Sequence, residues 1–230
     1  MLGLIYKDIA AHKYLLLFQA GFVAMVTFTI LSAKEQPAAA VFMLVMLYIG
    51  FSAIPETAMQ TDVAERWNVF ALTLPTAVRK TVLAKFLLMA FMYAGAFLCS
   101  VIIMAVFVQV SGTDFSVLPL VTLFAFIVGF DSITYALVFR FGHKRGLAFK
   151  ALSIFAVPML GVLYLLFGDL TIFGEDGITD FLMWIIDSDF SFADLVSKIC
   201  LPVVIFGIVS FAVCYSLSCK GYLKGIEAGD

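Results

Sequence analysis

Long apolar runs separated by short polar connections make up most of the chain. A bilayer has an apolar core about 30 Å thick, so a spanning helix needs about 20 mostly apolar residues. Six runs meet that length: 14–33, 38–54, 86–110, 117–139, 147–167 and 199–219. The pattern predicts an all-α, polytopic membrane protein with six transmembrane helices in a single domain, residues 1–230.

Composition and charge support this prediction and give it an orientation. With 63% hydrophobic residues and 25 Phe, a soluble globule of 230 residues would have more apolar side chains than it could bury. Of the 14 Lys and Arg residues, only Lys34 and Lys198 fall outside the amino terminus, the second and fourth connections, and the carboxyl terminus. The positive-inside bias then predicts a multi-pass protein with both termini in the cytoplasm, whose immediate partner is the lipid bilayer and not nucleic acid.

Two short amphipathic segments are predicted on the cytoplasmic side. In residues 2–13, Leu2, Ile5 and Ile9 recur at helical spacing, which predicts an interfacial helix before the first span. The second connection, residues 57–81, has one apolar helical face that ends at Pro75 and consists of Met59, Val63, Trp67, Phe70 and Leu74.

The polar side of the second connection carries Asp62, Glu65 and Arg66. Two interpretations of this helix remain open. It is either a surface connector anchored in the headgroups by Trp67, or a rigid element that docks a cytoplasmic partner, and the spacing does not separate them.

The outer connection, residues 168–198, is strongly acidic. Its carboxylates include Asp187, Asp189 and Asp194, and they flank an apolar stretch, 178–186, that contains Trp184. That stretch is too short to span the bilayer, so we expect a re-entrant or cap helix at the outer face. The acidic side either simply faces water or favours the release of cationic cargo.

Two carboxylates lie in or beside the predicted spans. Asp131 falls inside the fourth span, where a charge is costly unless it is partnered. We expect it to face a cavity or to hydrogen-bond a neighbouring subunit. Glu56 follows Pro55 at the end of the second span and is expected to be an interfacial or pathway carboxylate.

No motif predicts chemistry by this chain itself. The four Cys residues lie in or at the ends of spans without a Cys-x-x-Cys pair, and we expect neither a disulfide framework nor a metal site. Hydrolase signatures such as His-Glu-x-x-His or Gly-x-Ser-x-Gly are absent from the sequence, so we expect no enzymatic activity.

The sequence 65–75, Glu-Arg-Trp-Asn-Val-Phe-Ala-Leu-Thr-Leu-Pro, followed by Val78-Arg79-Lys80 and 82–86, resembles the cytoplasmic segment of small type 2 ATP-binding-cassette permeases. Residues 4–8 and Lys13 resemble their amino-terminal helix. In that family the segment couples the membrane subunit to a separate ATPase. The resemblance therefore implies a docking role for Asp62, Glu65, Arg66, Trp67 and Phe70.

The resemblance also implies partners and a location. The chain has no Gly-x-x-x-x-Gly-Lys-Ser/Thr loop, so ATP and Mg are expected on the ATPase subunit and no cofactor on this chain. A second permease copy, or a related permease, would complete the pathway in a bacterial plasma membrane. We expect amphipathic or cationic peptides as cargo. The alternative is a membrane sensor, scaffold or immunity protein that transports nothing.

Overall fold

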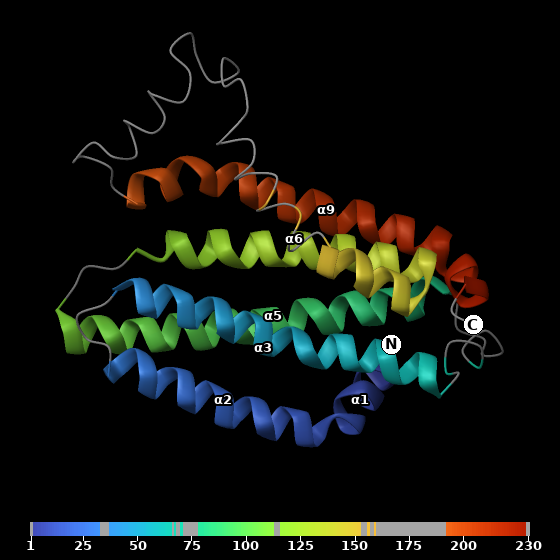
Figure 1. Cartoon of the computed structure of the whole chain (residues 1–230), viewed down its shortest axis with the longest axis horizontal. Coiled ribbons are helices and arrows are strands. Elements are labelled where there is room, and N and C mark those ends of the chain that lie inside the picture. The colour runs from blue at the N-terminus through green and yellow to red at the C-terminus, as the bar shows by residue number, and fades with distance from the viewer. Residues whose placement is uncertain are drawn as a thin grey trace, which may run out of the picture.

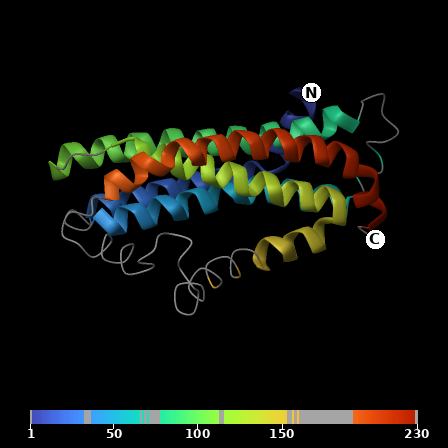
Figure 2. The same cartoon turned by 90° about the horizontal axis from the view of Figure 1, so that it is seen from above.

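The computed structural model describes residues 2–32, 37–65, 67, 70, 78–112, 116–152, 156, 159 and 192–228. The regular elements in this part of the chain are all helices, and the long ones lie side by side in one elongated bundle (Figures 1 and 2). Their bounds are α1 (Leu2–Ala11), α2 (Lys13–Ser32), α3 (Pro37–Ala64), α5 (Val78–Ser111), α6 (Leu118–Phe141) and α9 (Phe192–Ala228). Residues 143–152 are also helical.

Four helices in the described part of the chain are long and apolar enough to cross a bilayer. They are Lys13–Ser32, Val78–Ser111, Leu118–Phe141 and the section Ile199–Tyr222 of α9. Their large outward-facing side chains are apolar, for example Phe28 and Phe91, as expected where lipid is the solvent. The all-helical, multi-pass prediction is confirmed. The number of six spans stays a prediction, because α3, which contains the second predicted span, is not among these four helices and most of the fifth, 147–167, lies outside the described residues.

Two helix boundaries differ from those predicted. The second span was expected to end at Ile54, but α3 continues through Pro55 to Ala64. Proline removes one backbone hydrogen bond from a helix. Ile54 and Ala58, on either side of it, are almost completely buried, and this packing offsets that loss. The last helix begins at Phe192, within the segment predicted to be an outer loop, and not at Ile199.

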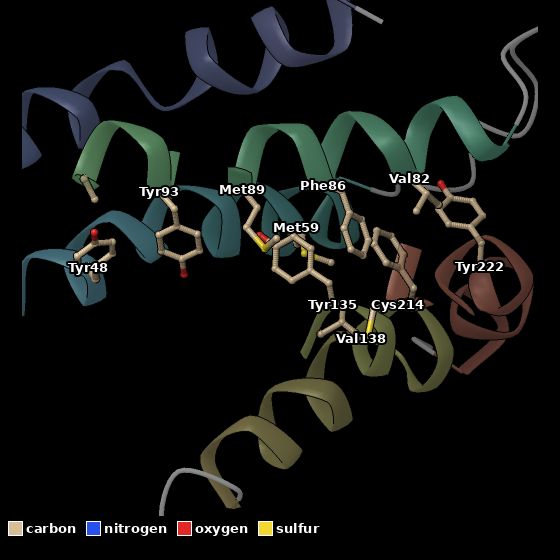
Figure 3. Packing of buried hydrophobic residues seen from close by; sticks show 12 residues of the cluster. Tyr48, Met59, Val82, Phe86, Met89, Tyr93, Tyr135, Val138, Cys214 and Tyr222 are labelled. Atoms are coloured by element: carbon tan, nitrogen blue, oxygen red, sulfur yellow. The ribbon is translucent and has the colours of Figure 1, made fainter. Parts of the chain in front are cut away.

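An aromatic cluster holds α5, α6 and α9 together, and Figure 3 shows its packing. The fully buried Phe86 of α5 lies at its centre. Its ring centroid is 5.6 Å from that of Tyr135 on α6 and 5.4 Å from that of Phe211 on α9, both edge-on. Edge-to-face pairs at these distances add directional attraction to the burial of apolar area.

Small residues let α6 and α9 approach closely. A Cβ atom on Gly207 would lie 2.6 Å from the backbone oxygen of Ala125, and one on Gly129 would lie 3.1 Å from the Cα of Gly207. Contact between backbones is the usual reason for small residues between membrane helices. Both helices run toward the end of the bundle where the two termini lie (Figures 1 and 2).

Candidate functional site

Four charged side chains form a compact ionic cluster at the end of the bundle that carries the termini. This cluster, called here the quartet, consists of Lys7 and Asp8 of α1, Asp62 of α3 and Lys85 of α5. Lys85 Nζ lies 2.8 Å from Asp8 Oδ2 and 2.5 Å from Asp62 Oδ2. Lys7 Nζ donates a 2.7 Å hydrogen bond to Asp62 Oδ1 and lies 3.2 Å from Asp8 Oδ1. Each carboxylate therefore contacts both ammonium groups.

Burial makes these contacts strong. The side chains of Asp8 and Asp62 are 3% and 4% exposed, and that of Lys85 is 8% exposed. Two positive and two negative charges balance, which is what allows charged groups to be buried. The quartet thus joins three helices that are far apart in sequence.

His12 strengthens the junction between α1 and α3. Its Nδ1 lies 2.8 Å from the backbone oxygen of Asp8, and its Nε2 lies 3.3 Å from Thr61 Oγ1. A carbonyl oxygen only accepts, so Nδ1 donates to that of Asp8, and Nε2 faces the hydroxyl of Thr61, whose own proton is donated to the backbone oxygen of Thr57. This histidine serves as a bridge between helices.

The chain that follows α3 is tied to the same cluster. Lys7 Nζ lies 4.1 Å from the centroid of the Trp67 ring, a distance at which an ammonium group is attracted to an aromatic face. The Trp67 ring is 5.2 Å from that of Phe70, centroid to centroid. Glu65 is exposed, and Phe70 is 51% exposed. Trp67 thus links this stretch to the quartet, and we refer to Glu65, Trp67 and Phe70 together as the patch.

The residues predicted to dock an ATPase therefore have different environments. Glu65, Trp67 and Phe70 lie at or near the surface, whereas Asp62 is buried beneath α1 and not on an outward polar face. Helical periodicity gave Asp62 a place on the polar side of the helix, but it could not show that α1 covers this residue. Arg66 lies outside the described residues. The docking roles themselves stay predictions.

A second ionic cluster joins α3, α5, α6 and the helical stretch 143–152. Lys150 Nζ lies 3.0 Å from Asp131 Oδ1 and donates a hydrogen bond to Glu56 Oε1. Tyr93 donates its hydroxyl proton to the other oxygen of Asp131. Asp131 is almost fully buried, and Glu56 keeps 29% of its side chain exposed. Two carboxylates here share one ammonium group.

Sequence reasoning identified both carboxylates but missed their partners. Asp131 was expected to face a cavity or a neighbouring subunit, yet Tyr93 and Lys150 of the same chain satisfy it. The sequence did contain a signal for this pairing, because Lys150 falls inside the predicted fifth span. A cation in a span requires a partner as much as a carboxylate does.

His143 begins the helical stretch 143–152, close to the second cluster. Burial lowers its pKa below the ordinary value, and the Glu56 carboxylate opposes this only in part. The imidazole is therefore neutral at physiological pH.

Within the described part of the chain, no three His, Cys, Asp or Glu side chains gather as metal ligands would. Of the predicted outer cap, Trp184, Asp187 and Asp189 lie outside the described residues. Asp194 falls in the first turns of α9. The role proposed for this cap is untested.

A family model described as ABC-2 family transporter protein matches residues 3–223, nearly the whole chain. The chain belongs to this family. Neither a curated protein nor a solved structure matches it. ABC-2 membrane proteins are permease subunits and not themselves enzymes, and they generally pair with an ATPase subunit. The match agrees with the resemblance read from residues 4–8 and 65–86.

Proposed function

We propose that this ABC-2 protein is the membrane-spanning subunit of an ATP-driven exporter and that a separate ATPase subunit, which carries ATP and Mg, docks on residues 57–81. The quartet carries the proposal. It fastens the end of α3 to α1 and to the start of α5, and its Lys7 contacts Trp67 of the patch formed by Glu65, Trp67 and Phe70. A force applied to that patch would therefore act on three helices together.

Rigid connection is what a coupling element requires. Interfaces and packed cores switch between discrete arrangements, so a rigid junction converts a local push into a movement of whole helices. In this proposal Glu65, Trp67 and Phe70 contact the ATPase, while Asp62 acts from inside by holding α3 to Lys7 and Lys85. The second ionic cluster extends the connection from α3 to α6.

The assembly and cargo follow from the same proposal. Two permease copies, or this chain with a related permease, would form one pathway, since two-fold pairing is the commonest oligomer geometry. Both termini would face the cytoplasm of a bacterial cell, as the distribution of Lys and Arg favours. The acidic stretch 168–198 supports amphipathic or cationic peptides as cargo.

The test measures ATP turnover by the ATPase that co-purifies with this chain, in liposomes, with native permease and with a Glu65→Lys/Trp67→Ala variant. A Lys144→Glu/Tyr14→Ala variant is the matched control, because it also reverses one exposed charge and truncates one aromatic side chain at this end of the bundle. We expect loss of complex formation and of stimulated turnover in the first variant only, at equal membrane insertion.

Two results would overturn the proposal. In one, no ATPase binds the native chain. In the other, the Glu65→Lys/Trp67→Ala variant stimulates turnover as well as the control variant does.

A further inference from the structure

A cavity of about 370 Å³ lies between α6 and α9, near the end of the bundle that carries the termini. It is separate from both ionic clusters. It is lined by Ile133, Ala136, Leu137, Arg140, Phe141, Cys214, Leu217, Lys220 and Gly221. The volume suffices for part of an elongated ligand but not for a whole peptide.

The lining is ordered along the bundle axis. On α6, Ile133 precedes Arg140 by two helical turns, or about 10 Å of helix. On α9, Cys214 and Leu217 precede Lys220, and both helices run toward the same end of the bundle. Both cations therefore lie toward the end of the cavity that is nearer the termini, and apolar side chains continue from them toward the middle of the bundle. Ile133 and Leu217 are 39% and 48% exposed, so this apolar part is open to a lipid.

The cations of this cavity differ from the lysines of the two ionic clusters. Lys7, Lys85 and Lys150 are all held by carboxylates. In contrast, no Asp or Glu lines the cavity, and neither Arg140 nor Lys220 has a salt-bridge partner among the residues that the structure describes. Arg140 also lies over the ring of Phe141, with its guanidinium carbon 5.5 Å from the ring centroid. Two cations beside an apolar surface complement an anionic amphiphile.

Close helix packing maintains this geometry. A Cβ atom on Gly221 would lie 3.3 Å from the Cα and Cβ atoms of Arg140, so α9 meets the backbone of α6 beside this arginine. Arg140 and Lys220 thus project from backbones in near contact and line the same cavity. Their spacing does not depend on a flexible loop.

We propose that this cavity binds one anionic phospholipid, with its phosphate between Arg140 and Lys220 and an acyl chain against Ile133, Leu137 and Leu217. In the orientation proposed above, the lipid belongs to the cytoplasmic leaflet, where basic pockets between helices select anionic headgroups. The apolar continuation of the site selects a phospholipid over a free phosphate ion.

The test is native mass spectrometry of the full chain, delipidated in detergent and titrated with phosphatidylglycerol or with phosphatidylcholine of the same acyl chains. We expect phosphatidylglycerol to bind more tightly than phosphatidylcholine. Each basic side chain near an anionic lipid contributes about fivefold in affinity, so an Arg140→Gln/Lys220→Gln variant should lose about 25-fold. The matched control is Arg79→Gln/Lys80→Gln, which removes two exposed cations from α5 at the same end and should bind as the native chain does.

A second variant tests the apolar part of the site. Leu217→Trp fills the cavity but keeps both cations. It should lower the affinity for phosphatidylglycerol by about fourfold for each methylene group displaced from the cavity. The proposal is overturned if the two lipids bind equally, or if the control variant loses as much affinity as the double variant. It is also overturned if inorganic phosphate displaces phosphatidylglycerol at a concentration equal to that of the lipid. A last contrary result is that the double variant loses a dimer of this chain but keeps its lipid adduct.

Discussion

Removing the ammonium group of Lys85 is expected to destabilise the bundle strongly. In the native quartet two cations balance Asp8 and Asp62. After Lys85→Met only Lys7 remains between the two buried carboxylates, and its side chain is 33% exposed, so water weakens its contribution. Breaking a buried ion pair by removing one partner costs about 3–5 kcal/mol. Methionine has a similar length and flexibility, so little of this loss would come from packing.

The assay is the melting temperature of the purified chain in detergent, followed by size-exclusion chromatography after heating. For chains of this length 1 kcal/mol corresponds to about 2–4 °C, so Lys85→Met should lower the melting temperature by about 6–20 °C. Adding Asp62→Asn removes the excess negative charge. Coupled residues differ from additivity by about 0.5–3 kcal/mol, and here the double variant should melt higher than Lys85→Met alone.

The control for this prediction is Lys80→Met, which removes an exposed cation from the same helix. Exposed substitutions usually change stability by less than about 0.5 kcal/mol, so this variant should melt within about 2 °C of the native chain. The ionic argument is refuted if Lys85→Met melts as the control does. It is also refuted if Asp62→Asn lowers the melting temperature of Lys85→Met further, because that would make both residues simple packing elements.

Two further predictions concern the second ionic cluster and the contact between α6 and α9. Lys150→Met should lower the melting temperature more than Asp131→Asn does. The first change leaves two carboxylates without their shared ammonium group, whereas the second leaves Lys150 paired with Glu56. Equal decreases in melting temperature would contradict this prediction. Gly207→Ala should lower the free energy of unfolding by about 1–3 kcal/mol, since its Cβ would lie 2.6 Å from a backbone oxygen of α6. At Gly21 an added Cβ meets nothing within 4 Å, so Gly21→Ala should be neutral or stabilising. Thermal melting of both glycine variants, measured side by side, checks this difference.

Hydropathy predicted the helices of this fold because the bilayer fixes how long and how apolar a span must be. It could not predict where α3 ends, because a proline interrupts a helix only when packing does not offset the lost hydrogen bond. It could not predict the ion pairs either. The contacts of Lys7 with Asp62 and of Lys85 with Asp8 join residues 55 and 77 positions apart. Helical periodicity shows which side chains share a face, but not which other helix covers that face.

The continuity of α3 gives the two ionic clusters a common axis. Glu56 and Asp62 lie on the same uninterrupted helix, six residues or about 9 Å apart along its axis, and they point to different sides of it. Asp62 meets α1 and α5, while Glu56 meets Lys150, which also holds Asp131 of α6. Had the second span ended at Ile54 and the connection formed a separate helix, as the sequence predicted, neither carboxylate would be joined rigidly to that span. Because Glu56 and Asp62 lie on one uninterrupted helix, a displacement of Asp62 is a displacement of Glu56, and the contacts of both clusters must change together.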